Sequence, residues 1–208
     1  MKNENKSDMS NWDIYKNLLL STKRKGIVEL IDWLENSDFI VAPASTRFHN
    51  CHEGGLLEHS LNVYKEASRQ KDLIKLFNVP QDSIIIASLL HDLCKVNYYK
   101  VEMRNTKVNG AWIQEPYYTV DDFLPIGHAE KSVIIAQQFI QLNEVEIAMI
   151  RNHMGFSKDE MSNVSALFNK YPESLIIHNA DLIATYVLES PGILEDFKAG
   201  LEEYKKEN

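Results

Sequence analysis

The run from Ile84 to Cys94 constrains the fold of this chain more than any other segment. Its sequence, Ile-Ile-Ile-Ala-Ser-Leu-Leu-His-Asp-Leu-Cys, is apolar around nearly the whole circumference of a helix. Such a helix has to lie inside a core rather than on a surface. Pro80 precedes the run, and Asp82 or Ser83 can cap it. We therefore predict a helical protein that is built around this segment as its central helix.

Most of the remaining chain also follows helical periodicity. Ser10 can serve as the N-cap of a first helix, and Asn143 with Glu146 forms an Asn-x-x-Glu capping signal. Pro172 suits the first turn of a last helix. The predicted helices cover residues 11–20, 24–35, about fifteen residues from Gly54-Gly55, 127–141, 143 to near 153, and 172 to about 189. Residues 41–46 break the pattern and are predicted to form a loop.

The segment 97–120 does not follow this pattern. It is rich in Tyr, Val, Thr and Trp, and it contains Asn109-Gly110, the favoured two-residue turn of a β-hairpin. The sequence therefore predicts an all-α domain with one β-hairpin insertion. Charged residues lie on the first arm of the hairpin, and we interpret them as solvated edge-strand charges, with a substrate rim as the alternative. They are Lys100, Glu102, Arg104 and Lys107.

Composition narrows the class of protein further. The chain has 208 residues, 44% of them hydrophobic, which suffices for one domain with a sizeable core. Its formal net charge of -8 argues against binding along a phosphate backbone without regard to sequence. Two cysteines cannot form a disulfide framework, the N-terminus is polar, and no apolar run approaches the length of a membrane span. We expect a cytoplasmic protein.

Six ionisable side chains fall inside or at the ends of the predicted helices. Ionisable groups that point into a core are costly unless they are paired or bind a metal. One such residue alone is more often a hydrogen-bonded core residue, but six on separate helices without matching basic partners favour a metal site. Imidazole and carboxylate ligands suit Zn, Fe, Mn or Ni, and the lack of Cys pairs argues against a structural zinc site. The six are His59, His91, Asp92, His128, His153 and Asp181.

The same residues lie in motifs that resemble the HD superfamily of metal-dependent phosphohydrolases. His91-Asp92 resembles the signature pair of that family, and the segment Gly54-Gly55-Leu56-Leu57-Glu58-His59 resembles the one that supplies its first histidine. Ala180-Asp181-Leu182 resembles the segment of its last aspartate. Gly127-His128-Ala129-Glu130 and Asn152-His153-Met154-Gly155 resemble the two further histidine motifs of the branch with two metals. The match covers roughly residues 43–190 and follows the order of the family, which a chance His-Asp pair would not.

This resemblance implies an HD-domain helical bundle at 43–190, on which the helices of residues 1–40 pack within a single domain, 1–208. It implies that His59, His91, Asp92 and Asp181 hold one metal ion, with Asp92 bridging to a second. His128 and His153 would complete that second site, so the cofactor would be one or two divalent transition metal ions, with two favoured. Lys95 often contacts the substrate phosphate in the family, and a solvated Lys near a helix C-terminus is the alternative.

The expected activity is hydrolysis of a phosphate ester in a nucleotide or nucleotide-like substrate, with Asp92 and Lys95 as catalytic residues. Two metal ions about 3.5–4 Å apart can activate a water and neutralise charge on a phosphoryl group. Arg47 and His49 are candidates for phosphate or base contacts at the cavity mouth, or else belong to an ordinary polar loop. A 3'-5' exonuclease or phosphodiesterase on short single strands is the alternative enzyme. A nucleotide-binding HD protein without turnover is the alternative that is not an enzyme.

Overall fold

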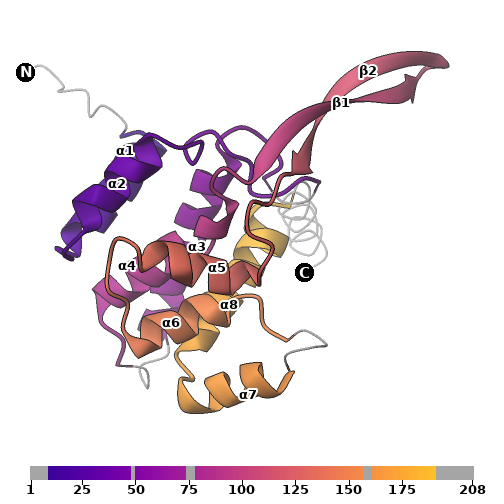
Figure 1. The fold of residues 1–208 in the computed structure, drawn as a ribbon. Coiled ribbons are helices and arrows are strands. Elements are labelled where there is room, and N and C mark those ends of the chain that lie inside the picture. Colours follow the sequence, from indigo (N-terminus) through magenta and orange to yellow (C-terminus); the bar gives the residue numbers. More distant parts are fainter. Residues whose placement is uncertain (1–8, 48–49, 74–77, 157–160, 191–208) are drawn as a thin grey trace, which may run out of the picture.

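The computed structural model describes residues 9–47, 50–73, 78–156 and 161–190, and most of these are helical (Figure 1). The α-helices are α1 (Asn11–Ser21), α2 (Ile27–Glu35), α3 (Gly55–Leu73), α4 (Gln81–Leu90), α5 (His128–Ala136), α6 (Glu144–Arg151), α7 (Met161–Lys170) and α8 (Ser174–Ile183). Two short helical segments follow α4 and α8: the 3-10 helix η1 (Leu93–Lys95) and the π-helix η2 (Ala184–Leu188). The strands β1 (Tyr99–Val108) and β2 (Ala111–Val120) form one hairpin. The predicted helical fold with one hairpin is confirmed.

Helix α4 occupies the centre of the core, as its apolar sequence predicts. Every residue from Ser83 to Leu90 is buried. The helix packs against α3 on one side and α6 on another, and α8 contacts both α3 and α6. The turn η1, which follows α4, contacts α5, so the residues after Leu90 lie where several elements meet.

The end of α4 differs from the prediction. The helix stops at Leu90, so His91 and Asp92 leave it, and the chain then forms the 3-10 turn η1. The last four carbonyls of an α-helix lack partners within the helix. The His91 ring meets one of them, because its Nδ1 donates to the carbonyl of Ser88 at 2.8 Å. At the other end, Pro80 rather than Asp82 or Ser83 occupies the N-cap position.

Other boundaries also differ from the predicted ones. Helix α2 begins at Ile27, because Gly26 adopts a left-handed φ of 88° that no helix continues, and a Cβ there would lie 1.9 Å from the Phe139 carbonyl oxygen. Helix α5 ends at Ala136 and not near 141. The last helix begins at Ser174 and turns into a π-helix at Ala184.

Helix α7 was not expected. Its apolar residues Val164, Leu167 and Phe168 have the i, i+3, i+4 spacing of a helix, and Val164 is fully buried. The segment is only ten residues long and half of its residues are polar, so this spacing is its main signal in the sequence.

The hairpin forms as predicted. Strands β1 and β2 pair antiparallel from Tyr99 opposite Val120 to Val108 opposite Ala111. Asn109 and Gly110 both have positive φ, 50° and 86°, which a two-residue hairpin turn of this hand requires. The ribbon extends away from the helical body (Figure 1), and most of its side chains are exposed.

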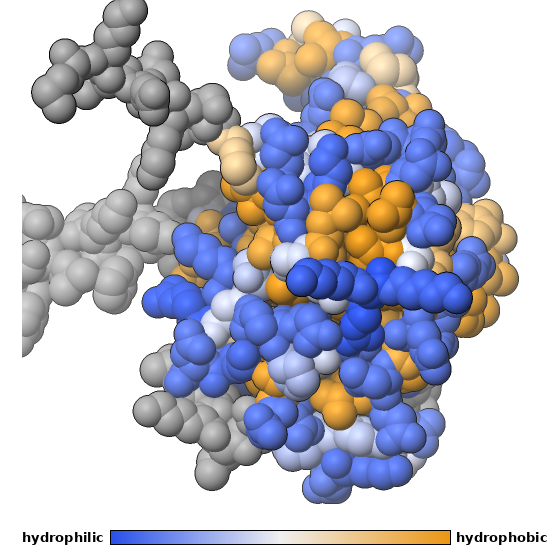
Figure 2. All heavy atoms as spheres, turned by 90° about the vertical axis from the view of Figure 1, so that its left-hand side faces the viewer, coloured by the Kyte–Doolittle hydropathy of each residue, from blue (hydrophilic) through white to orange (hydrophobic). Residues whose placement is uncertain are grey.

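The N-terminal helices turn their apolar residues inward. Tyr15 and Leu19 of α1 and Leu30 and Leu34 of α2 are fully buried. The outward face on this side shows mostly hydrophilic side chains with apolar patches between them (Figure 2). Among the described residues, no helix is long and apolar enough to cross a membrane.

Candidate metal centre

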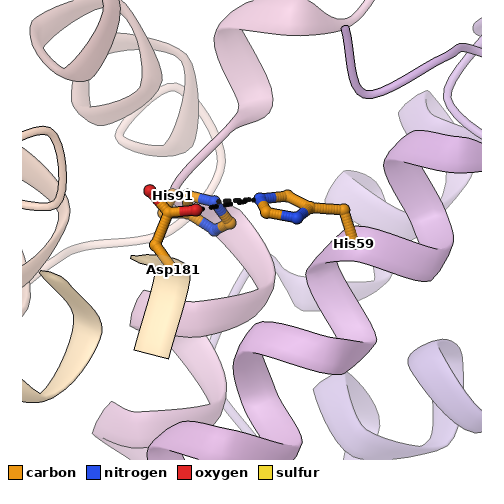
Figure 3. A group of neighbouring side chains, drawn as sticks. All are labelled: His59, His91 and Asp181. Atoms are coloured by element: carbon orange, nitrogen blue, oxygen red, sulfur yellow. Dashed lines mark hydrogen bonds and ion pairs between the residues drawn. The ribbon is translucent and has the colours of Figure 1, made fainter. Parts of the chain in front are cut away.

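Three side chains from different elements meet next to the end of α4. His59 of α3, His91 behind α4 and Asp181 of α8 point toward one another (Figure 3). The Nε2 atoms of His59 and His91 are 3.2 Å apart, and Oδ1 of Asp181 lies 3.2 Å from the same His59 nitrogen. Both rings are almost completely buried. Nitrogen and carboxylate ligand atoms at this spacing could hold one metal ion.

Asp92 lies at the centre of the wider cluster. Its Oδ2 is 3.4 Å from His91 Nε2 and 3.7 Å from His59 Nε2, while its Oδ1 is 3.7 Å from His153 Nε2. Burial raises the pKa of this carboxyl, but the charge of Lys95 and the contact with His91 outweigh burial and hold the pKa well below its usual range. Asp92 is therefore a carboxylate with one oxygen toward each side of the cluster.

His153 and His128 extend the cluster on the side of α5 and α6. His153 follows the end of α6 and groups with His91 and Asp92, whereas His128 begins α5 and groups with Asp92 and Cys94. The buried Nε2 of His153 has no hydrogen-bond partner within the described structure. Burial and the neighbouring His91 lower the pKa of His153 to about 4, and burial also lowers that of His128. Both imidazoles are neutral at pH 7, the form that binds a metal.

Hydrogen bonds fix the tautomers of three rings in this cluster. Nδ1 of His91 donates to the Ser88 carbonyl at 2.8 Å, and Nδ1 of His153 donates to the Ile150 carbonyl at 2.6 Å. A carbonyl can only accept, so Nδ1 carries the proton and Nε2 of the neutral ring keeps a lone pair. His59 has its Nδ1 3.0 Å from the carboxylate of Glu189. All three Nε2 atoms face the cluster, and the buried Nε2 of His153, which has no hydrogen-bond partner among the described residues, fits a divalent cation there.

The charges around His59 also fit a site for a cation. Burial lowers the pKa of His59, but hydrogen bonds to Asp181 and Glu189 outweigh burial and raise it to about 9. Burial raises the pKa of Asp181, but the hydrogen bond with His59 lowers the pKa by more than burial raises it, so this carboxyl stays ionised. In the metal-free protein a proton on His59 supplies positive charge among these carboxylates. A metal ion would take over that role.

Lys95 is buried beside the cluster and not solvated. Its Nζ lies 2.6 Å from Oδ2 of Asp92, and the side chain is 11% exposed. Burial lowers the pKa of Lys95, but Asp92 outweighs burial and raises it, so the side chain stays charged. The solvated alternative for Lys95 is therefore wrong. Its place in the 3-10 turn η1, and not one turn along α4, brings the ammonium over Asp92.

A cavity of about 260 Å³ opens onto the cluster. Its polar lining comes from the predicted site, and its apolar lining comes from residues near the ends of α6 and α8. The lining residues are Asp92, Lys95, His128, His153, Met154, Asp181, Leu182, Thr185 and Tyr186. Arg47 lies elsewhere, in a groove of about 700 Å³ between its own loop and the hairpin, with Arg104, Tyr117 and Tyr118. His49 lies outside the described residues.

The remaining histidines and cysteines differ in their surroundings. His178 donates from Nδ1 to the His153 carbonyl at 2.7 Å, so it supports the backbone at a candidate ligand. Cys94 is buried, and burial with the nearby Asp92 raises the pKa of its thiol to about 12. At neutral pH it is a thiol that packs as a small apolar residue.

Two residues that contact the cluster were not foreseen. Glu189 meets His59, and the Thr185 hydroxyl donates to Oδ1 of Asp181 at 3.4 Å. Thr185 lies one helical turn after Asp181, a spacing that could have indicated it. Glu189 follows Asp181 by eight residues, which is not a spacing at which helical residues share a face.

Comparison with known proteins supports the resemblance. The family model described as "HD domain" matches residues 56–186, more than half of the chain. The chain is also similar to dihydroneopterin 2',3'-cyclic phosphate phosphodiesterase of Methanocaldococcus jannaschii, with 42% identity over 65 residues. That match covers 29% of this chain and 26% of the length of that protein. No solved structure matches the chain significantly. The match over residues 56–186 shows that the chain belongs to the HD domain family.

Proposed function

We propose that this protein is a metal-dependent phosphohydrolase that cleaves a phosphate ester of a nucleotide or nucleotide-like substrate. The observation that carries the proposal is the buried convergence of six imidazole and carboxylate side chains beside a cavity. Perturbed ionisable groups that converge in a cleft are typical of catalytic sites. The similarity to a phosphodiesterase of cyclic nucleotide-like phosphates points to the same class of bond.

We assign the ligands as follows. His59, His91, Asp92 and Asp181 would hold one divalent ion, and Asp92 with His128 and His153 would hold a second. Bound divalent ions supply an activated water and neutralise charge that develops on the phosphoryl group. The mixture of nitrogen and oxygen donors suits Fe, Mn, Ni or Zn.

The chain's own side chains then position the substrate. The Lys95 ammonium, buried over Asp92, offers a positive charge to a phosphate oxygen inside the cavity. A volume of about 260 Å³ is small for a ligand site, so it suits the phosphate and part of the sugar. Met154 and Tyr186 line the same cavity and are 59% and 64% exposed. They provide an apolar rim for the planar ring of a nucleotide-like substrate.

The groove beside the hairpin favours the second candidate, a phosphodiesterase or 3'-5' exonuclease on short single strands. It combines arginines with tyrosines, as surfaces that bind single strands do. A series of aromatic rings lies between this groove and the cluster. The ring centroid of Tyr98 lies 5.7 Å from that of His128 and 5.0 Å from that of Tyr99. The ring centroids of Tyr99 and Tyr118 are 6.4 Å apart. A substrate with a second nucleotide could reach Arg47 along this path.

A substrate screen with matched metal analysis tests both candidates. The purified protein is loaded with Mn(II) and incubated with nucleoside 2',3'-cyclic phosphates, a pterin cyclic phosphate, mononucleotides and short oligonucleotides. We expect metal-dependent hydrolysis of one phosphate ester bond in the small substrates, which opens a cyclic phosphate to a phosphomonoester, and no hydrolysis by the Asp92→Asn variant, which keeps the shape of the side chain. Loss of oligonucleotide cleavage in Arg47→Ala, with small substrates unaffected, would support the second candidate.

Metal binding without turnover on any of these substrates would contradict the proposal. In that case the nucleotide-binding HD protein without catalysis becomes the better description.

A further inference from the structure

The carboxylate of Glu189 contacts His59 on the side that faces away from the other ligands. Its two oxygens lie 3.0 and 3.1 Å from His59 Nδ1, while Nε2 of the same ring faces His91 and Asp181. The Glu189 side chain is only 1% exposed. Carboxyl groups are rarely buried this far unless they are paired.

Asn62 helps to hold this carboxylate in place. It lies three residues after His59 on α3, and its Nδ2 donates to Oε1 of Glu189 at 2.9 Å. One helix therefore supplies both the ring and the amide that Glu189 contacts.

The π-helix η2 accounts for the position of Glu189. In a regular α-helix, a residue eight positions after Asp181 would lie about 80° away from it around the axis, whereas the seventh would share its face. A π-turn takes up one extra residue. Here the Glu189 N–H donates to the Ala184 carbonyl, five residues earlier, at 3.0 Å. Glu189 therefore lies where the seventh residue after Asp181 would lie in a regular α-helix. Asp181 contacts Nε2 of His59, and Glu189 contacts Nδ1 of the same ring.

We propose that Glu189 is a positioning residue for the metal centre: it fixes the His59 ring and tautomer so that Nε2 faces the ion, and it makes that nitrogen a stronger donor. This inference rests on the metal site of the proposed function. His91 and His153 are each fixed by a neutral carbonyl, so His59 alone of these three rings has a carboxylate on its Nδ1. Such carboxylate contacts to metal-bound histidines typically change metal affinity about 10–100-fold.

The test measures metal affinity directly. The dissociation constants of Mn(II) and Zn(II) are determined by competition with a chelator for wild type, Glu189→Ala, Glu189→Gln and the control Glu58→Ala. Glu58 precedes His59 in sequence, but its carboxylate is 45% exposed and lies near His52. We expect binding to weaken about 10–100-fold in Glu189→Ala. Glu189→Gln, which keeps the shape and an acceptor oxygen, should recover part of the loss, and Glu58→Ala should bind like wild type.

A structural role alone would give a different result. Glu189→Ala would then lower the thermal midpoints of the metal-free and metal-loaded protein equally and would leave the dissociation constants unchanged, which would overturn the inference. Glu189→Gln allows the same comparison if the alanine variant does not fold. Both measurements use the metal alone, so inactivity on every phosphoester would not affect them. A wild-type protein that binds no divalent ion would overturn the proposed function itself.

Discussion

Lys95 is expected to act on the substrate phosphate and not to bind the metal. Its charge lies 2.6 Å from Asp92 within a buried cluster, where a charge acts more strongly than in water. We expect Lys95→Met, which keeps the length of the side chain, to retain its metal. Turnover should fall about a hundredfold or more, because the lysine acts where the phosphoryl group gains charge. Metal content and kcat are measured on the same sample.

Lys100→Met provides the matched control for this prediction. Lys100 is half exposed on the hairpin and pairs with Glu102 at 3.3 Å, so its removal should change kcat little. If Lys95→Met kept wild-type turnover, its charge would serve only to balance Asp92.

The residues of the site could be predicted to different extents. All six candidate ligands carried a sequence signal, because each lies in a short motif or on an apolar helical face. The structure brings all six into overlapping groups. Lys95 could be named, but its burial could not, since that depends on where α4 ends. The contact of Glu189 with His59 could not be predicted, because a π-turn shifts the helical spacing by one residue and the sequence of Ala184–Leu188 carries no signal for such a turn.

Two histidines at the ends of α5 and α6 are the candidate ligands of a second ion. His128 begins α5 and groups with Asp92 and Cys94, whereas His153 follows α6 and groups with His91 and Asp92. We expect wild type to bind close to two ions per chain. His128→Ala and His153→Ala should each lose about one of them and keep the other. Metal analysis by mass spectrometry after dialysis measures this ratio.

His52→Ala serves as the control for these variants. Its side chain is 53% exposed, lies near Glu58, and belongs to none of the groups of candidate ligands. A wild-type ratio near one ion per chain, unchanged in His128→Ala and His153→Ala, would instead favour a mononuclear centre.

Elements were easiest to predict where local signals agree with the packing. The capping box of Asn143 and Glu146 and the Asn109-Gly110 turn are both present in the structure. The apolar pattern predicts the end of α4 too late, because it continues through Leu93 and Cys94. The helix in fact ends at Leu90, and the His91 side chain donates a hydrogen bond to one of its last carbonyls. A side-chain contact with the carbonyl three residues earlier accompanies this helix end, and the apolar pattern alone does not show such a contact.

At the scale of the whole molecule, polar contacts join the N-terminal segment to the core. The Tyr15 hydroxyl donates to the Leu89 carbonyl at 2.8 Å, deep in the core. Arg24 pairs with Asp82 at 3.0 Å and also with Glu146, whose side chain is completely buried. Glu146 in addition accepts from Ser83 at 2.7 Å. These contacts support the prediction of a single domain, in which the helices of residues 1–40 fold together with the core at 43–190.

Glu146 tests that prediction, because it connects the N-terminal segment with α4 and α6. Among the described residues, its removal leaves Arg24 with Asp82 as its one ion-pair partner, and it leaves the Asn143 backbone N–H without its acceptor. We expect Glu146→Ala to lower the free energy of unfolding by about 3 kcal/mol or more. Glu144→Ala, which removes an exposed bond to Tyr171, should cost at most about 1 kcal/mol.

Urea unfolding followed by two signals shows whether the two parts unfold together. Circular dichroism reports on all helices, whereas tryptophan fluorescence reports mainly on Trp12 and Trp33 of the N-terminal helices, because Trp112 on the hairpin is already 71% exposed. In the wild-type protein both signals should change at the same urea concentration. The reason is that the ion pair between Arg24 and Glu146 joins the N-terminal helices to the core, so the two are expected to unfold together. A fluorescence transition that precedes the loss of helix would mean that residues 1–40 form a separate unit, and the single-domain prediction would be wrong.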